Sequence, residues 1–273
     1  MIPPVLLRAG FGLYGRLAPR QAARAAAGLL TRPRGRNPPQ PWEHEPTQPL
    51  AEQVVLPGDL HALQWGSAGP VVLGLHGWRG RPTQLGRLAE SLVAAGFRVV
   101  ALDAPGHGRS RGPAATPRLL ADALVEAGSA LGEVHALIGH SLGGAAAPIA
   151  MELGLRVRRL VMIGSPARPS RLIAWYADQL GLPERARHRL DEWFDAHAGR
   201  PAALLDPVAL TPPAETSIMV VHDEDDEIIP VADARLLEAA WPPAQMLYTR
   251  GLGHRNLLSD PEVVAAVHAF IAG

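Results

Sequence analysis

Apolar residues recur in two alternating patterns along this chain from about residue 50 onward. Compact apolar runs such as PVVLGLHGW and VHALIGHS have the length and composition of buried strands. Between such runs lie longer segments, for example TQLGRLAESLVAAG, in which apolar residues recur every three or four positions, as in a helix with one buried face. This alternation predicts an α/β fold: a mostly parallel, doubly wound sheet of about eight strands with helices on both faces.

Local signals predict where several of these elements begin and turn. In AEQVVLPGDLHALQWG, two short apolar runs flank Pro57 and Gly58, which predicts two antiparallel strands joined by a turn. Thr116 followed by Pro117 predicts the start of a helix, because threonine caps free amides and proline fits the first helical position. We expect the functional groups in loops at the carboxyl ends of the parallel strands, where such sheets hold their sites.

The alternation breaks between about residues 166 and 213. This segment contains no clear strand but has two helical patterns, RLIAWYADQLGL and ERARHRLDEWFDAHAG. An insertion of this kind is typical of a helical cap over a site, although two ordinary packed helices would give the same pattern. Its aromatic residues would favour an apolar acyl or aromatic group in the substrate: Trp175, Tyr176, Trp193 and Phe194.

The first 42 residues contain seven arginines and no acidic residue. Arg16, Arg20 and Arg24 would share one side of a helix, and Pro19 predicts the start of a second helix. One interpretation is a basic amphipathic segment, within residues 1–30, that contacts an anionic membrane surface. An organelle transit peptide would look similar. The other interpretation is an extension that packs on the domain and leaves its arginines in solvent.

The stretch that follows, RPRGRNPPQPWEHEPTQP, is proline-rich and polar, which predicts an extended linker. The chain is therefore expected to consist of an N-terminal extension and linker over residues 1–49 and one domain over residues 50–273. The helical cap would be an insertion into that domain near residues 166–213.

Composition narrows the class of protein. The 273 residues include 26 Lys and Arg against 26 Asp and Glu, so no nucleic-acid partner is indicated. A hydrophobic content of 47% excludes general disorder, and no apolar run is long enough to predict a membrane-spanning helix. The absence of cysteine excludes disulfides and a cysteine nucleophile. We expect a cytoplasmic protein, with membrane association through the N-terminal segment as the alternative; the sequence leaves the oligomeric state open.

One serine stands between glycines at the junction of a strand-like and a helix-like segment, GHSLGG. Gly139, Ser141 and Gly143 form a Gly-x-Ser-x-Gly motif. In this context the motif predicts a sharp strand-to-helix turn that presents a nucleophilic serine at a helix N-terminus. A glycine-rich helix start that Ser141 merely caps is the alternative.

A serine nucleophile needs a base that is held by a third group. His254, in GLGHRN near the end of the chain, is the best candidate for the base. The acid would follow the strand in VVHDEDDEIIP, and that stretch offers five candidates: Asp223, Glu224, Asp225, Asp226 and Glu227.

Together these motifs resemble the α/β-hydrolase superfamily over roughly residues 50 to 273. The resemblance is carried, in chain order, by HGW, DAPGHGRS, GHSLGG, HDEDDEIIP and GLGH. It implies the α/β-hydrolase fold, with Ser141 as nucleophile and His254 as general base. It also implies Asp226 as the acid, with Asp225 as second choice. Family members usually carry glycine at the position of Asp223, so the acid-bearing loop departs from the family pattern.

Two backbone N–H groups are expected to hold the oxyanion that forms when the serine attacks. Leu142 directly follows the serine, and Trp78 follows the His-Gly pair in the position of the family's second donor. Three other residues of the motif loops are interpreted as scaffolding: His76, Asp103 and His107. The bulky Trp78 differs from the glycine-rich loop of some lipases, which weakens a lipase assignment.

The sequence thus predicts a serine hydrolase that cleaves small carboxylic esters through an acyl-enzyme, without a metal or organic cofactor. The same three side chains would serve an amidase, an aminopeptidase-like enzyme, a thioesterase or an acyltransferase. A non-catalytic protein that uses this fold as a ligand pocket is the alternative of another class.

Overall fold

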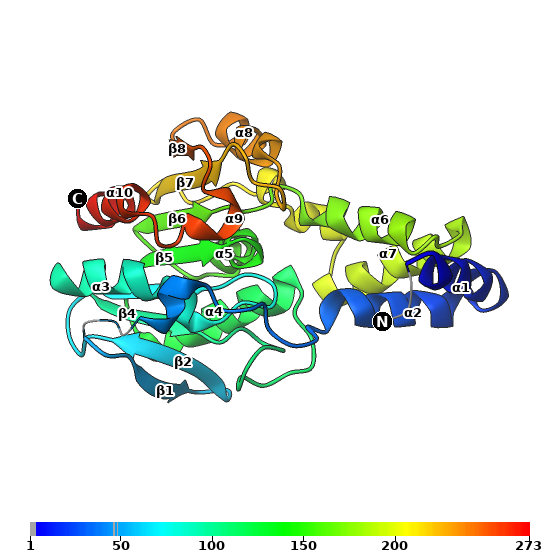
Figure 1. Ribbon diagram of the computed structural model, residues 1–273, viewed down its shortest axis with the longest axis horizontal. Helices are drawn as coiled ribbons and strands as arrows, with labels where there is room; N and C mark the ends of the chain where they lie inside the picture. The colour runs from blue at the N-terminus through cyan, green and yellow to red at the C-terminus, as the bar shows by residue number, and fades with distance from the viewer. Residues whose placement is uncertain (1–3, 46, 48) are drawn as a thin grey trace.

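The computed structural model describes residues 4–45, 47 and 49–273. Within them lies an eight-stranded sheet of order β1-β2-β4-β3-β5-β6-β7-β8 (Figure 1). β1 (Glu52–Leu56) and β2 (Leu60–Trp65) form an antiparallel hairpin, and β2 pairs antiparallel with β4. The other strands run parallel: β3 (Val71–Leu75), β4 (Arg98–Leu102), β5 (Val134–His140), β6 (Arg159–Ile163), β7 (Ser217–Asp223) and β8 (Gln245–Thr249). The fold class predicted from the sequence is confirmed.

Helices cover both faces of this sheet because its central strands are apolar on both sides. Along β6, Leu160 and Met162 pack into the core on one face, whereas Val161 and Ile163 pack into the core on the other. α3 (Gly86–Ala94) and α10 (Pro261–Ala272) pack over the second of these faces. The first face is covered by α4 (Pro117–Leu131), α5 (Leu142–Glu152) and α8 (Val231–Ala240).

The local signals act where the sequence predicts. The Thr116 hydroxyl accepts a hydrogen bond from the Leu119 amide at 3.2 Å, and Pro117 is the first residue of α4. The turn of the β1–β2 hairpin contains Gly58 at φ 76° and Asp59 at φ 57°, and both lie in the left-handed region. A short 3₁₀ helix, η2 (Pro82–Leu85), leads into α3.

Four helices form a separate layer at one end of the molecule, where Figure 1 shows them side by side. They come from two distant parts of the chain: α1 (Pro4–Leu17) and α2 (Pro19–Thr31), then α6 (Pro169–Gln179) and α7 (Glu184–Ala198). α6 begins six residues after β6 ends, so this layer starts at the carboxyl-end edge of the sheet. Two 3₁₀ segments, η3 (Ala202–Leu205) and η4 (Pro207–Ala209), lead from α7 back toward β7.

This four-helix layer has its own apolar core. Buried alanines along one face of α2 let that helix pack closely against α7, which contributes Leu190 and Phe194. The alanines are Ala22, Ala23, Ala26 and Ala27. Of the two interpretations of the N-terminal segment, packing on the rest of the protein therefore describes α2.

Helix α1 has a mixed environment. Leu7 and Phe11 face the core of the four-helix layer, whereas Leu6, Leu13 and Leu17 are 62%, 59% and 76% exposed. Because residues 6, 13 and 17 are seven and four apart, these leucines form one apolar stripe in solvent. Of the helices in the described part of the chain, none combines the length and apolar character needed to span a bilayer. Contact with a membrane surface stays a prediction.

The stretch after α2 packs against the sheet domain, whereas the sequence predicted an extended linker. It lies on the sheet domain, contains the 3₁₀ helix η1 (Pro41–His44), and is held there by side-chain contacts. Glu43 accepts a hydrogen bond from the Thr83 hydroxyl at 2.8 Å, and the Trp65 indole N–H donates to the Thr47 hydroxyl at 2.8 Å. Polar side chains of this stretch therefore serve as anchors.

Candidate active site

Ser141 sits in a strained turn between β5 and α5. It has φ 54° and ψ −122°, a conformation that a residue with a side chain rarely adopts. Its amide donates to the Ile163 carbonyl at 2.8 Å, and its own carbonyl accepts from the amides of Gly144 and Ala145. The strained backbone is therefore fixed from both sides, by strand β6 and by the first turn of α5.

Glycines let three backbone segments meet at this turn. A Cβ atom on Gly139 would lie 2.4 Å from the Gly144 Cα, and one on Gly143 would lie 2.4 Å from the Leu75 carbonyl oxygen. A Cβ on Gly77 would lie 2.7 Å from the Ser141 Cβ and 3.2 Å from its Oγ. The loop that follows β3 therefore lies directly against the serine, and glycine is required for that approach.

Asp226 and His254 meet at the end of β7. Asp226 Oδ2 lies 2.7 Å from His254 Nδ1, and Oδ1 accepts hydrogen bonds from the amides of Ile228 and Ile229. Burial alone would raise the pKa of Asp226, but the hydrogen bond from His254 and those two amides outweigh it and hold the pKa below its usual value. The ionised carboxylate therefore fixes the imidazole with its proton on Nδ1.

His254 also lies beside the turn that carries Ser141. The His140 ring donates from Nε2 to the His254 carbonyl at 3.0 Å, and the centroids of the two rings are 4.7 Å apart. Burial lowers the pKa of His140 to about 3, so this supporting ring is neutral. Within the described residues the structure contains no hydrogen bond between the Ser141 hydroxyl and the His254 ring; such bonds often tighten only in the substrate complex.

The other acids of the same loop have different partners. The Asp225 carboxylate accepts from the Gly251 amide at 3.0 Å. Asp223, where the family usually has glycine, accepts a hydrogen bond from the Thr249 hydroxyl. It also accepts from three backbone amides, those of Asp225, Leu252 and Gly253, each at 3.0 Å. Asp223 thus anchors the residue that directly precedes His254. The sequence analysis did not predict this role of Asp223. The replacement of the family's usual glycine by aspartate was the signal that could have indicated it.

His254 itself lies in a short helix, α9 (Gly253–Asn256), and not in an open loop. The short helix and the hydrogen bonds of Asp223 together fix the backbone position from which the His254 side chain extends. A Cβ on Gly164, just after β6, would lie 3.3 Å from His254 Nδ1, so the ring also packs against that backbone. The predicted serine, histidine and Asp226 are therefore gathered at the carboxyl ends of β5 and β7.

The loop after β3 carries Trp78, the predicted oxyanion donor. His76 is fully buried; its Nδ1 donates to the Gly77 carbonyl at 2.8 Å and its Nε2 accepts from the Ala104 amide at 3.0 Å. Trp78 and Leu142 both pack against the apolar core on the α4–α5 face. Trp78 therefore lies close to Ser141, next to the Gly77 contact described above.

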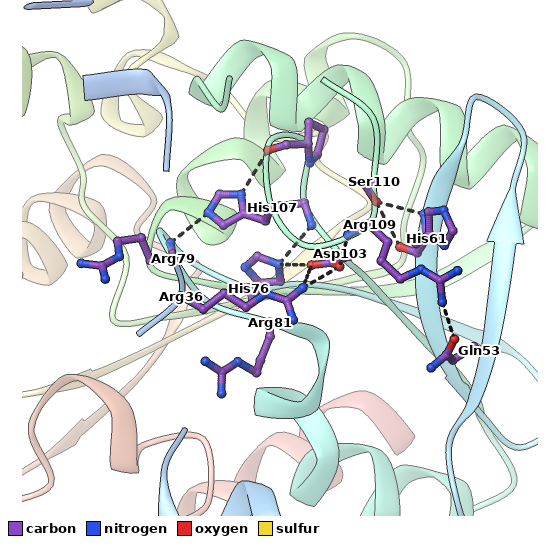
Figure 2. Close-up of polar contacts among 12 residues, drawn as sticks. Arg36, Gln53, His61, His76, Arg79, Arg81, Asp103, His107, Arg109 and Ser110 are labelled. Atoms are coloured by element: carbon purple, nitrogen blue, oxygen red, sulfur yellow. Dashed lines mark hydrogen bonds and ion pairs between the residues drawn. The ribbon is translucent and has the colours of Figure 1, made fainter. Parts of the chain in front are cut away.

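A polar cluster around the buried Asp103 and His107 supports this loop (Figure 2). The His107 ring accepts from the Arg79 amide at 2.9 Å and donates to the Pro105 carbonyl at 3.1 Å. Asp103 accepts from the Arg109 amide at 2.9 Å and pairs with Arg36 at 2.8 Å. The side chains of Asp103, His107 and Arg36 hold backbone or one another and do not reach Ser141, which agrees with scaffolding.

The four aromatic residues of the predicted cap differ in environment. Trp175 and Tyr176 are 52% and 43% exposed, Phe194 is buried inside the four-helix layer, and Trp193 stacks on His197 at 3.7 Å. The preference for an apolar or aromatic acyl group inferred from these residues stays a prediction. Among the described residues no group of three or more potential ligand side chains is arranged to hold a metal ion.

Comparison with known families agrees with this arrangement. The model of the alpha/beta hydrolase family matches residues 71–267, which run from the first residue of β3 into α10. The chain belongs to the alpha/beta hydrolase family. No curated protein matches this hydrolase in sequence.

Solved structures share the fold at low sequence identity. The thioesterase domain from the curacin biosynthetic pathway is 21% identical, with a TM-score of 0.57 over 82% of this chain and 100% of that one. A thermophilic esterase from Thermogutta terrifontis, Est2 with butyrate bound, is 17% identical, with a TM-score of 0.60 over 81% and 93%. A membrane phospholipase A described as a bacterial virulence factor is 18% identical, with a TM-score of 0.60 over 98% and 91%. The last alignment is long enough to include the N-terminal helices of this hydrolase.

Proposed function

We propose that this hydrolase cleaves carboxylic esters of small acyl substrates through an acyl-enzyme on Ser141. The observation that carries the proposal is the hydrogen bond between Asp226 and His254, in a ring that lies beside a serine held at φ 54°. A strained serine at a helix N-terminus next to an oriented histidine is the arrangement that serine acyl transfer needs. Esterase and lipase structures among its structural neighbours support the choice of an ester.

In the proposed reaction, His254 Nε2 takes the hydroxyl proton of Ser141 as the oxygen attacks the ester carbonyl. Asp226 holds the ring through Nδ1 and stabilises the imidazolium that forms. The amides of Trp78 and Leu142 donate to the oxyanion, and His254 then returns the proton to the leaving alcohol. Water, deprotonated by the same ring, releases the acid from the acyl-enzyme.

The support for Trp78 and Leu142 is positional. Leu142 is the first residue of α5, where backbone amides are not used by the helix itself. The Gly77–Trp78 peptide has its carbonyl engaged by the His76 ring, so its amide points the other way, because the two groups of a planar peptide are opposed.

A fluorophosphonate tests the nucleophile directly, because it reacts covalently with an activated serine. We expect the wild-type protein to be labelled at Ser141 and to hydrolyse short aryl esters, and the Ser141→Ala variant to lose both properties while it stays folded. Ser259→Ala, at a half-exposed serine near α10, is the matched control and should keep both. Labelling of the Ser141→Ala variant at the wild-type rate would remove Ser141 from this role.

Leaving-group preference is decided by a substrate panel. Matched esters, thioesters and amides of graded acyl length should show the highest kcat/KM for esters. A higher kcat/KM for thioesters or amides would leave the acyl-enzyme mechanism in place but show that esters are not the preferred substrates.

A further inference from the structure

The chain between α2 and η1 touches the loop that carries Trp78. The Asn37 amide donates to the Arg79 carbonyl at 2.8 Å, and the Asn37 side-chain amide donates to the Trp78 carbonyl at 3.1 Å. In return, the Arg81 guanidinium donates to the Asn37 carbonyl. The backbone amide, the backbone carbonyl and the Nδ2 group of Asn37 thus bond to three residues of this loop. We call residues 35–37 the strap.

The strap holds a strained part of the loop. Arg79 has φ 56°, in the left-handed region where a residue with a side chain persists only if its surroundings fix it. The Trp78–Arg79 peptide is fixed at both ends, because its carbonyl accepts from Asn37 and its N–H donates to the His107 ring. The next carbonyl, that of Arg79, is also taken by Asn37. Asn37 therefore supplies two of these three contacts.

The neighbouring peptide holds the predicted oxyanion donor. The Gly77 carbonyl accepts from His76 Nδ1 and from the Gly80 amide, which directs the Trp78 N–H to the opposite side. Trp78 is thus the residue between two fixed peptides, one set by His76 and one set by Asn37. Rotation of the first peptide would turn the Trp78 N–H directly, and release of the second would let Trp78 shift and carry its N–H out of place.

The strap is itself anchored in the domain. Arg36 Nη2 lies 2.9 Å and 2.8 Å from the two carboxylate oxygens of Asp103, as Figure 2 shows. Asp103 stays ionised: burial raises its pKa, but the adjacent His76 ring, the hydrogen bond from the Arg109 amide and the charge of Arg36 outweigh that effect and lower it. The Arg36 ion pair therefore fixes the strap one residue before Asn37.

We propose that Asn37 is a positioning residue for the oxyanion-binding amide of Trp78, so that the N-terminal segment takes part in building the active site. The proposal rests on the proposed function, because it assigns a purpose to the Trp78 amide. Asn37 does not touch the substrate; it acts through the Trp78–Arg79 peptide. Loss of its side chain should lower the rate of the chemical step more than substrate binding, since the donor acts on charge that develops in the transition state.

The test compares Asn37→Ala and Asn37→Asp with wild type and with Arg34→Ala, an exposed arginine on the same stretch, as the matched control. Asp has the shape of Asn but no side-chain N–H, so both Asn37 variants lose the bond to Trp78. We expect kcat for aryl esters and the rate of fluorophosphonate labelling to fall about tenfold or more, since a small misplacement of a catalytic group can cost up to about 100-fold. KM, the pH profile and the melting temperature should stay close to wild type, and Arg34→Ala should match wild type throughout.

The outcomes separate the two proposals. If wild type is labelled and both Asn37 variants are labelled equally fast, Asn37 has no positioning role, whereas the Ser141 assignment stands. If the variants lose turnover only in proportion to lost folded protein, the role is structural and the proposal is overturned. If wild type is not labelled at all, the proposed function fails and the role of Asn37 fails with it.

Discussion

The sheet domain and the four-helix layer are built on different principles. In the sheet domain most of the parallel strands lead into a helix that packs on the same sheet. Both apolar cores consist largely of leucine, valine, isoleucine and alanine from neighbouring elements. In the four-helix layer, α2 packs on α7, and the two helices are more than 150 residues apart in the chain. Alanine dominates the face of α2 that makes this contact.

The two regions contribute differently to the predicted active site. Ser141, Asp226 and His254 all come from the carboxyl-end loops of the sheet domain, and their positions depend on buried strands. The N-terminal segment contributes no side chain to them, yet its strap reaches the loop of Trp78. The segment that differs most in composition from the rest of the chain is therefore attached both to the four-helix layer and to the predicted site.

The largest effect is expected within the sheet domain. Asp226→Asn keeps the shape of the acid but removes the charge that fixes His254, so turnover should fall by about 1,000- to 10,000-fold. Asp225→Asn, which only loses an acceptor for the Gly251 amide, should stay within a few-fold of wild type. Steady-state kinetics on an aryl ester measures both, and the reverse ranking would transfer the role to Asp225.

A smaller effect should come from the alanine face of the four-helix layer. Ala26 is completely buried against α7, so Ala26→Leu should lower the free energy of unfolding by about 1–3 kcal/mol through overpacking. The neighbouring Ala25 is exposed, and Ala25→Leu should leave stability within about 0.5 kcal/mol. Urea denaturation distinguishes them; equal stability of the two variants would mean that α2 does not pack as described.

Acid should weaken the sheet domain through its buried histidines. Burial lowers the pKa of His140 to about 3 and that of His107 to about 4, from 6.5 when exposed. The unfolded chain therefore binds more protons below pH 6.5, so the free energy of unfolding should fall as pH falls through that window. We expect a loss of roughly 1–2 kcal/mol per ring between about pH 7 and about pH 5.

Two variants assign this pH dependence. His140→Gln and His107→Gln should each flatten the slope of the free energy of unfolding against pH. An unchanged slope for His140→Gln would show that this ring titrates normally in the folded protein.

The smallest effect concerns the exposed face of α1. If the membrane contact predicted from the sequence holds, the wild-type protein should sediment with vesicles that contain phosphatidylglycerol, and less with pure phosphatidylcholine. Leu13→Ser/Leu17→Ser should reduce that binding several-fold, whereas Val55→Ser/Leu204→Ser, at exposed apolar residues elsewhere, should not. Equal vesicle binding by wild type and both double variants would show that the exposed leucines of α1 do not contact the membrane.

Much of the sheet domain could be predicted from the sequence because its signals are local. The Thr116–Pro117 helix start, the β1–β2 hairpin and the strand-to-helix turn at Ser141 each depend on residues within a few positions. The pairing of Asp226 with His254 was implied only by the resemblance to a family. Five consecutive acidic residues, 223–227, follow the same strand, so position after a strand does not single one out. Periodicity alone did not separate them.

Sequence by itself thus determined the order of strands and helices, the strained serine turn and the apolar faces, because each is encoded by neighbouring residues. Only the tertiary structure decided that the alanines of α2 meet α7, that Asp223 anchors the backbone next to His254, and that Asn37 reaches the Trp78 loop. These contacts join residues that are from 30 to more than 150 positions apart. Their partners are set by how the whole chain packs, and no local pattern records that choice.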